Sequence, residues 1–300
     1  MFVKSKEYSY GFVVLNYNNY QDTIACVNSI LQLSHRDDYY ITIVDNASSN
    51  NSFDILKSEF EGHIKITLIH ANQNGGYSSG NNIGIRFLLK MGIVQIVIAT
   101  NDTEIISTNI LEVLDKLDLS GVGIVGTDVL TPDGIHQNPP LHQLSILYCL
   151  NLYLYEPMAA ARKKLYLFFP FILRFRRRSI AKKIEYIGDI SSPIDCVSVY
   201  MLHGCFLLLT EAYLSKAGLL DEHLFMYGEE DLMAWNCEFY GLKRLYLPNV
   251  KVMHKDGQST KIAHKKNKEE FVRMMTIQAK NYLVKKIDKW ALLKVLLRGI

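Results

Sequence analysis

The first 130 residues alternate between short runs typical of β-strands and longer stretches with helical spacing. We expect strands at Tyr10–Leu15, Tyr40–Val44, Ile66–Ile69, Ile93–Ala99 and Val122–Gly126. We expect helices between them at Tyr20–Leu33, Asn51–Phe60, Ser78–Met91 and Thr108–Leu117. This alternation builds βαβ units with right-handed crossovers around a mostly parallel sheet. Ligands of such sheets bind at the carboxyl ends of the strands, near the point where the strand order reverses.

Four consecutive strands are expected to end in polar residues at that edge. They lead into Asn16-Tyr17-Asn18, Asp45-Asn46-Ala47-Ser48, Asn72-Gln73-Asn74-Gly75-Gly76 and Thr100-Asn101-Asp102. Asn and Asp favour turns in any protein, and that preference explains one or two of these ends more easily than all four. The pattern therefore predicts a polar ligand site along the edge of the sheet.

Length and composition indicate one large folded α/β domain with additions. The chain has 300 residues, of which 49% are hydrophobic and 21% charged, and its net charge is +3. Because the net charge is small, nucleic acid is not expected as a partner. Strongly basic stretches at 162–183 and 255–298 indicate instead a surface that meets something anionic, or solvated lysines on helix faces.

The five cysteines show no CxxC spacing and have apolar neighbours, so we expect buried thiols in a reducing compartment. The N-terminal residues lack the apolar stretch of a signal peptide, and no uninterrupted apolar run is long enough to span a membrane. We therefore expect a cytoplasmic protein, at most peripheral at the inner face of the cell membrane.

The segment 137–190 is rich in Leu, Tyr and Phe and carries clusters of Arg and Lys. This composition favours an interfacial amphipathic segment on an anionic membrane surface. The alternative is a helical insertion packed on the domain, with its basic face in water. We expect this segment to form the acceptor or membrane side of a catalytic domain that spans residues 1–260.

Strand patterns resume after the insertion. We expect strands at Cys196–Met201, Cys205–Thr210, Leu242–Leu247 and Val250–His254. A helix is expected to begin near Glu229 and to reach about Tyr240, with Gly241 ending it. Residues 261–300 are expected to form a basic helical extension.

Several residues in these segments suit metal, phosphate and proton chemistry. Asp102 at a strand end suits Mg²⁺ or Mn²⁺, which prefer oxygen ligands and share substrate phosphates. His254 gains weight as a second ligand only if the fold brings it near Asp102. The glycine-rich stretch at 74–84 suits close approach of a diphosphate, whereas neither GxGxxG after the first strand nor GxxxxGK[ST] is present.

Three consecutive acids, Glu229, Glu230 and Asp231, follow the apolar and aromatic stretch LFMYG. The dipole at a helix N-terminus stabilises acids there, which is sufficient to explain their presence. Acids in an apolar setting also have raised pKa values and serve as general bases. Both interpretations stay open at this point.

Taken together, the motifs resemble those of the family 2 glycosyltransferases, which have the GT-A fold. The pieces, in family order, are VVLNYNN (13–19), IVDNASS (43–49), NQNGGYSSGNNIG (72–84), TND (100–102), MLHGCFLLL (201–209), LDEHLFMYGEEDLMAW (220–235) and VMHKDGQS (252–259). Within the family, the chain looks most like the rhamnosyltransferase type. The resemblance covers about residues 8–260 and implies a mixed, mostly parallel sheet flanked by helices.

The resemblance implies a role for each matching position. Asn16, Tyr17 and Asn18 line the nucleotide pocket, Asp45 contacts the base, and Asn72 and Gly76 belong to the loop over the nucleotide and ribose. Asp102 matches the last acid of the DxD-type motif that holds a divalent metal, Mn²⁺ or Mg²⁺, and His254 approaches that metal. Thr100 or Asn101 replaces the usual first acid, and Asn101 joins the donor-binding set. Counting from Gly228 makes Glu230 the base, and Asp231 is the second candidate.

The expected function is that of an inverting glycosyltransferase. It moves a sugar from a nucleoside-diphosphate sugar to a glycan or a lipid-linked glycan in cell-surface polysaccharide assembly. One alternative is a catalytically inactive nucleotide-sugar-binding partner subunit, and another is a nucleotidyltransferase, which would carry a glycine-rich basic signature after the first strand. We leave formation of a homodimer open.

Overall fold

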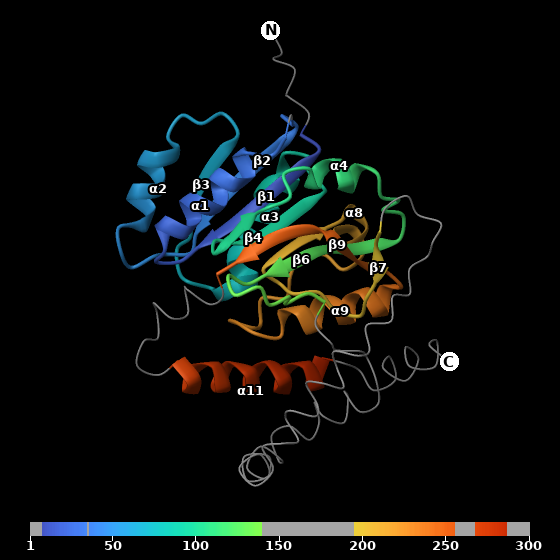
Figure 1. Ribbon diagram of the computed structural model, residues 1–300. Helices are drawn as coiled ribbons and strands as arrows, with labels where there is room; N and C mark the ends of the chain where they lie inside the picture. Colours follow the sequence, from blue (N-terminus) through green and yellow to red (C-terminus); the bar gives the residue numbers. More distant parts are fainter. Residues whose placement is uncertain (1–7, 35, 140–194, 256–267, 287–300) are drawn as a thin grey trace, which may run out of the picture.

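The computed structural model describes residues 8–34, 36–139, 195–255 and 268–286 (Figure 1). Its centre is a mixed sheet with the strand order β3-β2-β1-β4-β8-β6-β9-β5, and β7 pairs with β9. The strands of the first half are β1 (Tyr10–Asn16), β2 (Tyr39–Asp45), β3 (Ile66–His70) and β4 (Ile96–Thr100). These four strands are parallel, and the order reverses at β1, which lies between β2 and β4.

The second half of the sheet contains the antiparallel pairs. Its strands are β5 (Thr103–Ile105), β6 (Val122–Leu130), β7 (Val197–Ser198), β8 (Phe206–Leu209) and β9 (Lys243–His254). β8 runs antiparallel to both β4 and β6, β9 runs parallel to β6, and β5 and β7 run antiparallel to β9. β1, β2, β3, β4, β6 and β9 thus share one direction, which confirms the prediction of a mixed, mostly parallel sheet.

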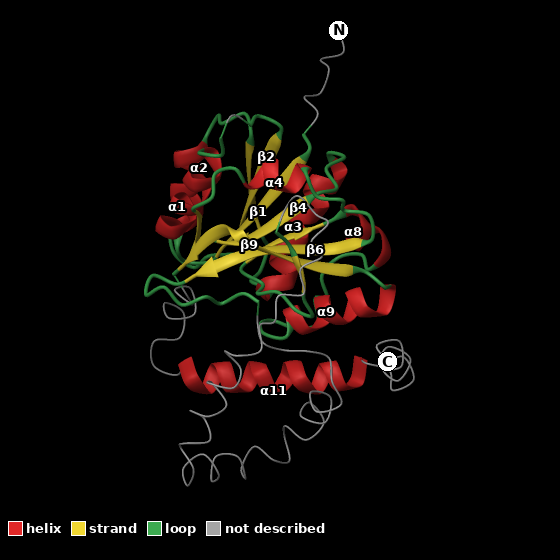
Figure 2. Ribbon diagram, turned by 45° about the vertical axis from the view of Figure 1, so that its right-hand side comes forward, coloured by secondary structure: helices red, strands yellow, loops and turns green. Residues whose placement is uncertain are grey.

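Helices cover both faces of the sheet (Figure 2). They are α1 (Tyr20–Leu31), α2 (Ser52–Phe60), α3 (Gly76–Lys90), α4 (Ile110–Asp115), α8 (Glu211–Lys216), α9 (Glu229–Tyr240) and α11 (Lys268–Lys286). Side chains from α1, α2 and α4 form one buried cluster, and side chains from α3, α8 and α9 form the other. β1 supplies Phe12 and Val14 to the first cluster and Val13 to the second, because successive side chains of a strand point to opposite faces.

The expected helix after the glycine at 228 is confirmed as α9. Gly228 precedes it with φ +88° and Gly241 follows it with φ +64°. Both angles lie in the left-handed region, which glycine enters without a Cβ penalty. The two glycines therefore set the ends of the helix that carries the three acids.

The structure corrects three expectations in the second half. Leu242–Leu247 and Val250–His254 belong to one strand, β9, whose pairing with β6 shifts register between Thr127 and Asp128. The strand expected at Cys196–Met201 is limited to the two residues of β7. β5 and α8 have no counterpart in the prediction because each is shorter than the windows that reveal periodicity.

α11 lies within the stretch 261–300, where a helical extension is expected, and α9 lies between it and the sheet in both views (Figure 1 and Figure 2). None of the helices in the described ranges combines the length and the apolar character that crossing a membrane requires. Most of the expected insertion at 137–190, including its basic aromatic part, lies outside the described residues, as do 256–267 and 287–300.

Candidate active site

The ends of β1 and β2 carry a buried polar network. Asn16 Nδ2 donates to Asp45 Oδ1 over 2.6 Å and to Ser48 Oγ over 3.2 Å, and no surface of Asn16 or Asp45 is accessible. The Asp45 carboxylate also accepts from the backbone N–H and the hydroxyl of Ser48, and Oδ2 lies 2.8 Å from His70 Nδ1. His70 is therefore bonded to the buried Asp45 while 46% of its own side chain stays accessible to solvent.

The turn after β1 is held against the turn after β2. Asn18 has a positive φ of +56°, and its Oδ1 accepts the backbone N–H groups of Ser49 and Asn50. The Asn18 backbone N–H donates to Ser48 Oγ over 2.8 Å. Tyr17 is half-buried beside it. The two turns therefore form one wall at the carboxyl edge of the sheet.

The glycine-rich loop before α3 is anchored by Asn46. Asn46 Nδ2 donates to Asn74 Oδ1 over 2.9 Å and to the Gly76 carbonyl over 3.1 Å. Gly76 has φ +80°, and a Cβ there would lie 1.9 Å from the Phe225 carbonyl oxygen. Asn72 is exposed at the start of the loop. Glycine is therefore required at 76 because the chain around 225 packs directly on it.

Thr100, which ends β4, and Asn101, which begins the turn after it, are bonded to neighbouring segments. Asn101 Nδ2 donates to the Asn19 carbonyl over 3.0 Å and to Thr23 Oγ1 over 3.1 Å, and the residue is buried. Thr100 Oγ1 donates to the Cys205 carbonyl. The amide and the hydroxyl that stand in place of the expected first acid are thus engaged with neighbouring side chains and backbone.

Asp102, which follows Asn101 in this turn, meets His254 at the end of β9. Asp102 Oδ1 lies 3.4 Å from His254 Nε2, and both residues are buried. His254 Nδ1 lies 2.7 Å from Gln137 Oε1. Because the amide oxygen can only accept, Nδ1 carries the proton, and in the neutral ring Nε2 presents a lone pair to the carboxylate. The two residues form an ion pair when the ring is protonated and offer two ligand atoms to a cation when it is neutral.

These atoms fit a divalent ion. Adjacent ligands of an octahedral ion lie roughly 3 Å apart when each bond is near 2.1 Å, so a small closure of the 3.4 Å gap would let both atoms bind one ion. Gln137 holds the histidine in the tautomer that ligation requires, as outer partners of metal-binding histidines commonly do. His254 was expected to be a second ligand only if the fold brought it near Asp102, and the structure places it there.

The loop before β8 joins this pair to the acids of α9. Gly204 N–H donates to Glu230 Oε1 over 3.1 Å, and a Cβ at Gly204 would lie 3.0 Å from the same oxygen. On either side of this glycine, the donor atoms of His203 and Cys205 form a group with His254 in which all lie within 4.8 Å of one another. The rings of His203 and His254 meet edge to face at 5.4 Å. The fold thus gathers Asp102, His254 and Glu230 around one short loop.

The three acids at the start of α9 have different surroundings. Burial and then the charge of Glu230 raise the pKa of Glu229 well above its usual range, and Glu229 Oε2 is a buried atom with no hydrogen-bond partner. Burial raises the pKa of Asp231 to about 6, against an opposing effect of Lys280. Glu230 alone of the three accepts the Gly204 N–H.

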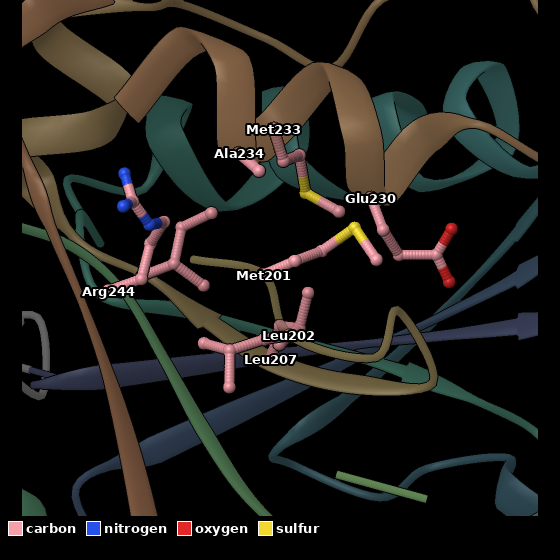
Figure 3. A pocket seen from close by; sticks show the side chains of 8 residues that line it. Met201, Leu202, Leu207, Glu230, Met233, Ala234 and Arg244 are labelled. Atoms are coloured by element: carbon pink, nitrogen blue, oxygen red, sulfur yellow. The ribbon is translucent and has the colours of Figure 1, made fainter. Parts of the chain in front are cut away.

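The side chain of Glu230 borders a small apolar pocket. The pocket is lined by Ile124, Met201, Leu202, Leu207, Glu230, Met233, Ala234 and Arg244. Figure 3 shows the Glu230 carboxylate pointing away from Met201 and Met233, and the Arg244 guanidinium lying on the other side of the pocket. Arg244 forms an ion pair with Glu238 instead. The carboxylate of Glu230 therefore points out of the apolar pocket and accepts a backbone N–H.

Helix α11 packs on the loop that leads to these acids. Tyr282 Oη donates to Asp221 Oδ2 over 2.8 Å, and Lys286 forms an ion pair with the same carboxylate. These bonds, with those from His223, outweigh burial and lower the pKa of Asp221 to about 2. Ala279 faces Gly228, where a Cβ would lie 2.8 Å from the alanine Cβ. The extension is thus part of the site's support.

Most of these residues were predicted at the sheet edge from the sequence, but some that organise the site were missed. Asn46 and Gln137 were not singled out, because a buried amide is recognisable only from its partners. His203 and Cys205 stood within a quoted motif without an assigned role. The sequence feature that could have identified them is a histidine and a cysteine on either side of Gly204, directly before an apolar strand.

The family model described as glycosyl transferase family 2 matches residues 12–185. This range begins in β1 and extends past the end of β6. The dTDP-rhamnosyl transferase RfbF of Shigella flexneri is 22% identical over 248 residues, which cover 83% of this chain and 69% of that protein.

Two solved structures share the fold. The crystal structure of S. aureus TarS 1-349 matches with a TM-score of 0.55 and 11% identity over 96% of this chain and 69% of that one. The mannosyltransferase PcManGT from Pyrobaculum calidifontis, in complex with GDP-Man and Mn²⁺, matches with a TM-score of 0.53 and 13% identity over 98% of this chain and 74% of that one. The likeness confirms the predicted GT-A architecture.

Proposed function

The chain belongs to glycosyl transferase family 2, and from that membership we propose that it transfers a sugar from a nucleoside-diphosphate sugar, with inversion, to a glycan or lipid-linked glycan. The observation that carries this proposal is the meeting of Asp102, His254 and Glu230 around residues 203–205. It unites a cation-binding pair with a carboxylate held by a single backbone N–H. An inverting transfer needs both, one for the leaving group and one for the nucleophile.

We assign donor binding to the carboxyl edge of β1, β2 and β4. Asn16, Tyr17, Asn18 and Asp45 form the wall on which we place the nucleobase and ribose, and Asn72 and Gly76 form the adjoining loop. Asn101 supports this wall from behind through its bonds to α1. The edge lies at the reversal of strand order, where α/β sheets bind their ligands.

Asp102 and His254 would hold the divalent ion, Mn²⁺ or Mg²⁺. When bound, such an ion offsets the charge that grows on a nucleoside diphosphate leaving group. The protein's own contribution is to orient the ligands: Gln137 holds His254, and the Lys255 N–H donates to the Asp102 carbonyl over 2.9 Å. PcManGT, solved in complex with GDP-Man and Mn²⁺, supports the same pairing of donor and ion.

Glu230 is the general base in this proposal, and Asp231 is the alternative. The Glu230 carboxylate is oriented by Gly204, whose neighbours carry the donor atoms near His254. Asp231 instead lies within the electrostatic reach of Lys280 on α11. Glu230 would take the proton of the acceptor hydroxyl as that oxygen attacks the anomeric carbon and the bond to the diphosphate breaks.

We further propose that the enzyme works in the cytoplasm, in cell-surface polysaccharide assembly, with residues 1–260 as the catalytic domain and 261–300 as its extension. The similarity to a dTDP-rhamnosyl transferase supports a deoxyhexose donor. The basic aromatic residues 145–183 would hold the acceptor at an anionic membrane surface. Flotation with anionic and neutral liposomes tests this: recovery of the protein with neither kind contradicts membrane binding.

The deciding experiment measures transfer and hydrolysis from UDP-, GDP- and dTDP-sugars with Mn²⁺ or Mg²⁺, using wild type, Glu230→Gln and the exposed control Glu59→Gln. We expect Glu230→Gln to lose roughly 10²- to 10⁴-fold in turnover while donor binding persists, as removal of a general base does. Glu59→Gln should match wild type. Full activity in Glu230→Gln moves the base to Asp231.

One observation favours a second function, a binding subunit without catalysis. Thr100 and Asn101 leave Asp102 as the single carboxylate of its turn. In that case, calorimetry would record donor binding while no acceptor supports turnover in wild type. Transfer by wild type that depends on Glu230 excludes this alternative.

A further inference from the structure

The turn after β4 offers a cation only one side-chain carboxylate. The Thr100 hydroxyl is bonded to Cys205 and the Asn101 amide nitrogen to Asn19 and Thr23, so Asp102 supplies the carboxylate of this turn. A hard ion such as Mg²⁺ is held by oxygen ligands and shows little preference for nitrogen or sulfur. The other ligand atoms near Asp102 therefore decide which ion binds.

Those donors come from the loop before β8. The Thr100 backbone N–H donates to the Cys205 carbonyl over 2.8 Å, so the pairing of β8 with β4 holds the loop against the turn. His203, Cys205 and His254 place an imidazole, a thiol and a second imidazole within 4.8 Å of one another. His254 also lies 3.4 Å from Asp102. Three donors from two segments thus lie together, and one of them, His254, also faces Asp102.

The burial of this group favours a bound ion over a chance cluster of polar side chains. Cys205 is 2% exposed and His254 6% exposed, and Asp102 is 5% exposed. A buried carboxylate beside an imidazole is stabilised when a cation binds there, because the cation compensates the lost solvation of the charge. His254 already has its outer nitrogen paired with Gln137.

We propose that His203, Cys205 and His254 bind one ion together, so that the site prefers Zn²⁺ or Co²⁺ to Mg²⁺. Two imidazole nitrogens and one thiolate suit a borderline ion that keeps a fourth position for another ligand. On binding, Cys205 releases its proton to solvent and the sulfur coordinates as thiolate. His203 gives up the loose bond of 3.2 Å that its Nδ1 accepts from the Cys205 N–H, or ligates through its other nitrogen.

The significance of this site for catalysis rests on the proposed function, but ion binding itself does not. A Zn²⁺ ion with three protein ligands keeps an open position, as in catalytic sites. The diphosphate of a bound donor would then have a place at the ion.

The test is a titration of the full-length protein with Co²⁺, followed by absorption. We expect a thiolate-to-cobalt band in the near ultraviolet and the intense visible bands of a four-coordinate ion. Cys205→Ser should lose the first band, and His203→Ala should weaken Co²⁺ and Zn²⁺ binding by at least about tenfold, since even outer-shell changes reach that size. Cys196→Ser, a half-buried cysteine elsewhere, should keep both.

X-ray absorption at the zinc edge of the wild-type, Zn²⁺-loaded protein gives a second measurement that does not depend on a variant folding. We expect one sulfur among the scatterers. A spectrum with oxygen and nitrogen alone, together with Mn²⁺ and Zn²⁺ affinities that Cys205→Ser and His203→Ala leave unchanged, would overturn the proposal. Donor binding and the Glu230→Gln result would then still stand, because they do not depend on these two ligands.

Discussion

The carboxyl edge of β1 and β2 and the acidic start of α9 handle buried carboxylates in opposite ways. Asp45 is completely buried, yet Asn16, Ser48 and His70 satisfy its oxygens. Glu229 leaves one buried oxygen without a partner, and its pKa is raised well above the ordinary range. A satisfied polar network makes a rigid frame, whereas acids with perturbed pKa values are typical of places where protons move.

The largest loss of stability should come from a substitution at Gly76, where the loop before α3 packs on the chain near Phe225. Gly76→Ala places a Cβ where the Phe225 carbonyl lies and forces a positive φ on alanine, so we expect the free energy of unfolding to fall by roughly 3 kcal/mol or more. Urea unfolding measures it. Gly62→Ala is the matched control: φ is +75° there, but nothing lies within 4 Å, so only the backbone cost of about 1 kcal/mol remains. Equal losses of stability in Gly76→Ala and Gly62→Ala would show that Phe225 does not pack closely on Gly76.

Asp45→Asn tests whether the first region is a saturated frame. The new amide group would face donors from Asn16 or Ser48, and a buried donor pair without an acceptor should cost about 3 kcal/mol. Chemical unfolding at neutral pH is the measurement. Asp54→Asn, which changes an exposed acid on α2, should cost less than about 0.5 kcal/mol. A small loss at Asp45 would mean that its bonds contribute little, and the contrast between the regions would weaken.

The acidic start of α9 should make the protein less stable as pH rises. An acid whose pKa is lowered on folding has the opposite effect. The pKa of Asp231 is about 6 in the folded protein, against an ordinary value of 3.8. The folded state therefore holds this proton more tightly, and stability falls as pH rises from about 4 to about 6, by on the order of 2–3 kcal/mol. Asp231→Asn should remove the part of this fall that Asp231 causes and raise stability near neutral pH, while the part from Glu229 remains.

Urea midpoints of wild type and Asp231→Asn at about pH 4 and about pH 7.5 check the sign. Glu61→Gln, which alters an exposed acid, serves as the control for general charge effects. Parallel loss of stability in wild type and Asp231→Asn would show that Asp231 ionises at no cost, and that it is as well accommodated as Asp45.

The smallest expected effect concerns the support from α11. Tyr282→Phe removes one hydroxyl bond to Asp221 and keeps the ring stacked on His223, so we expect a loss of about 1 kcal/mol. Hydrogen exchange should also rise in the loop after Asp221 but not at β1. Tyr240→Phe, at an exposed tyrosine, is the control. Unchanged exchange in that loop would show that α11 does not support the segment that leads to the three acids.

Much of the frame was predictable because it depends on local pattern and on strand register. Parallel pairing sets Asn16 beside Asp45 and Leu15 beside Thr100, so polar residues that end neighbouring strands must meet. The end of α9 was predicted from Gly241, which has the positive φ that such a stop requires. Burial was not predictable, because whether Asn101 faces a ligand or the interior depends on α1 lying behind it.

Local pattern alone specified the α/β alternation, the family motifs and the positions of the acids, since each depends on periodicity or on residues adjacent in the chain. The packed fold was needed to show that His254 lies 3.4 Å from Asp102, that Gly204 holds Glu230 and that His203 and Cys205 complete the cluster. Asp102 and the loop at 203–205 stand about 100 residues apart in the chain, and the pairing of β5 with β9 and of β4 with β8 brings them together. Such pairing is set by the packing of the whole sheet, which no local pattern specifies.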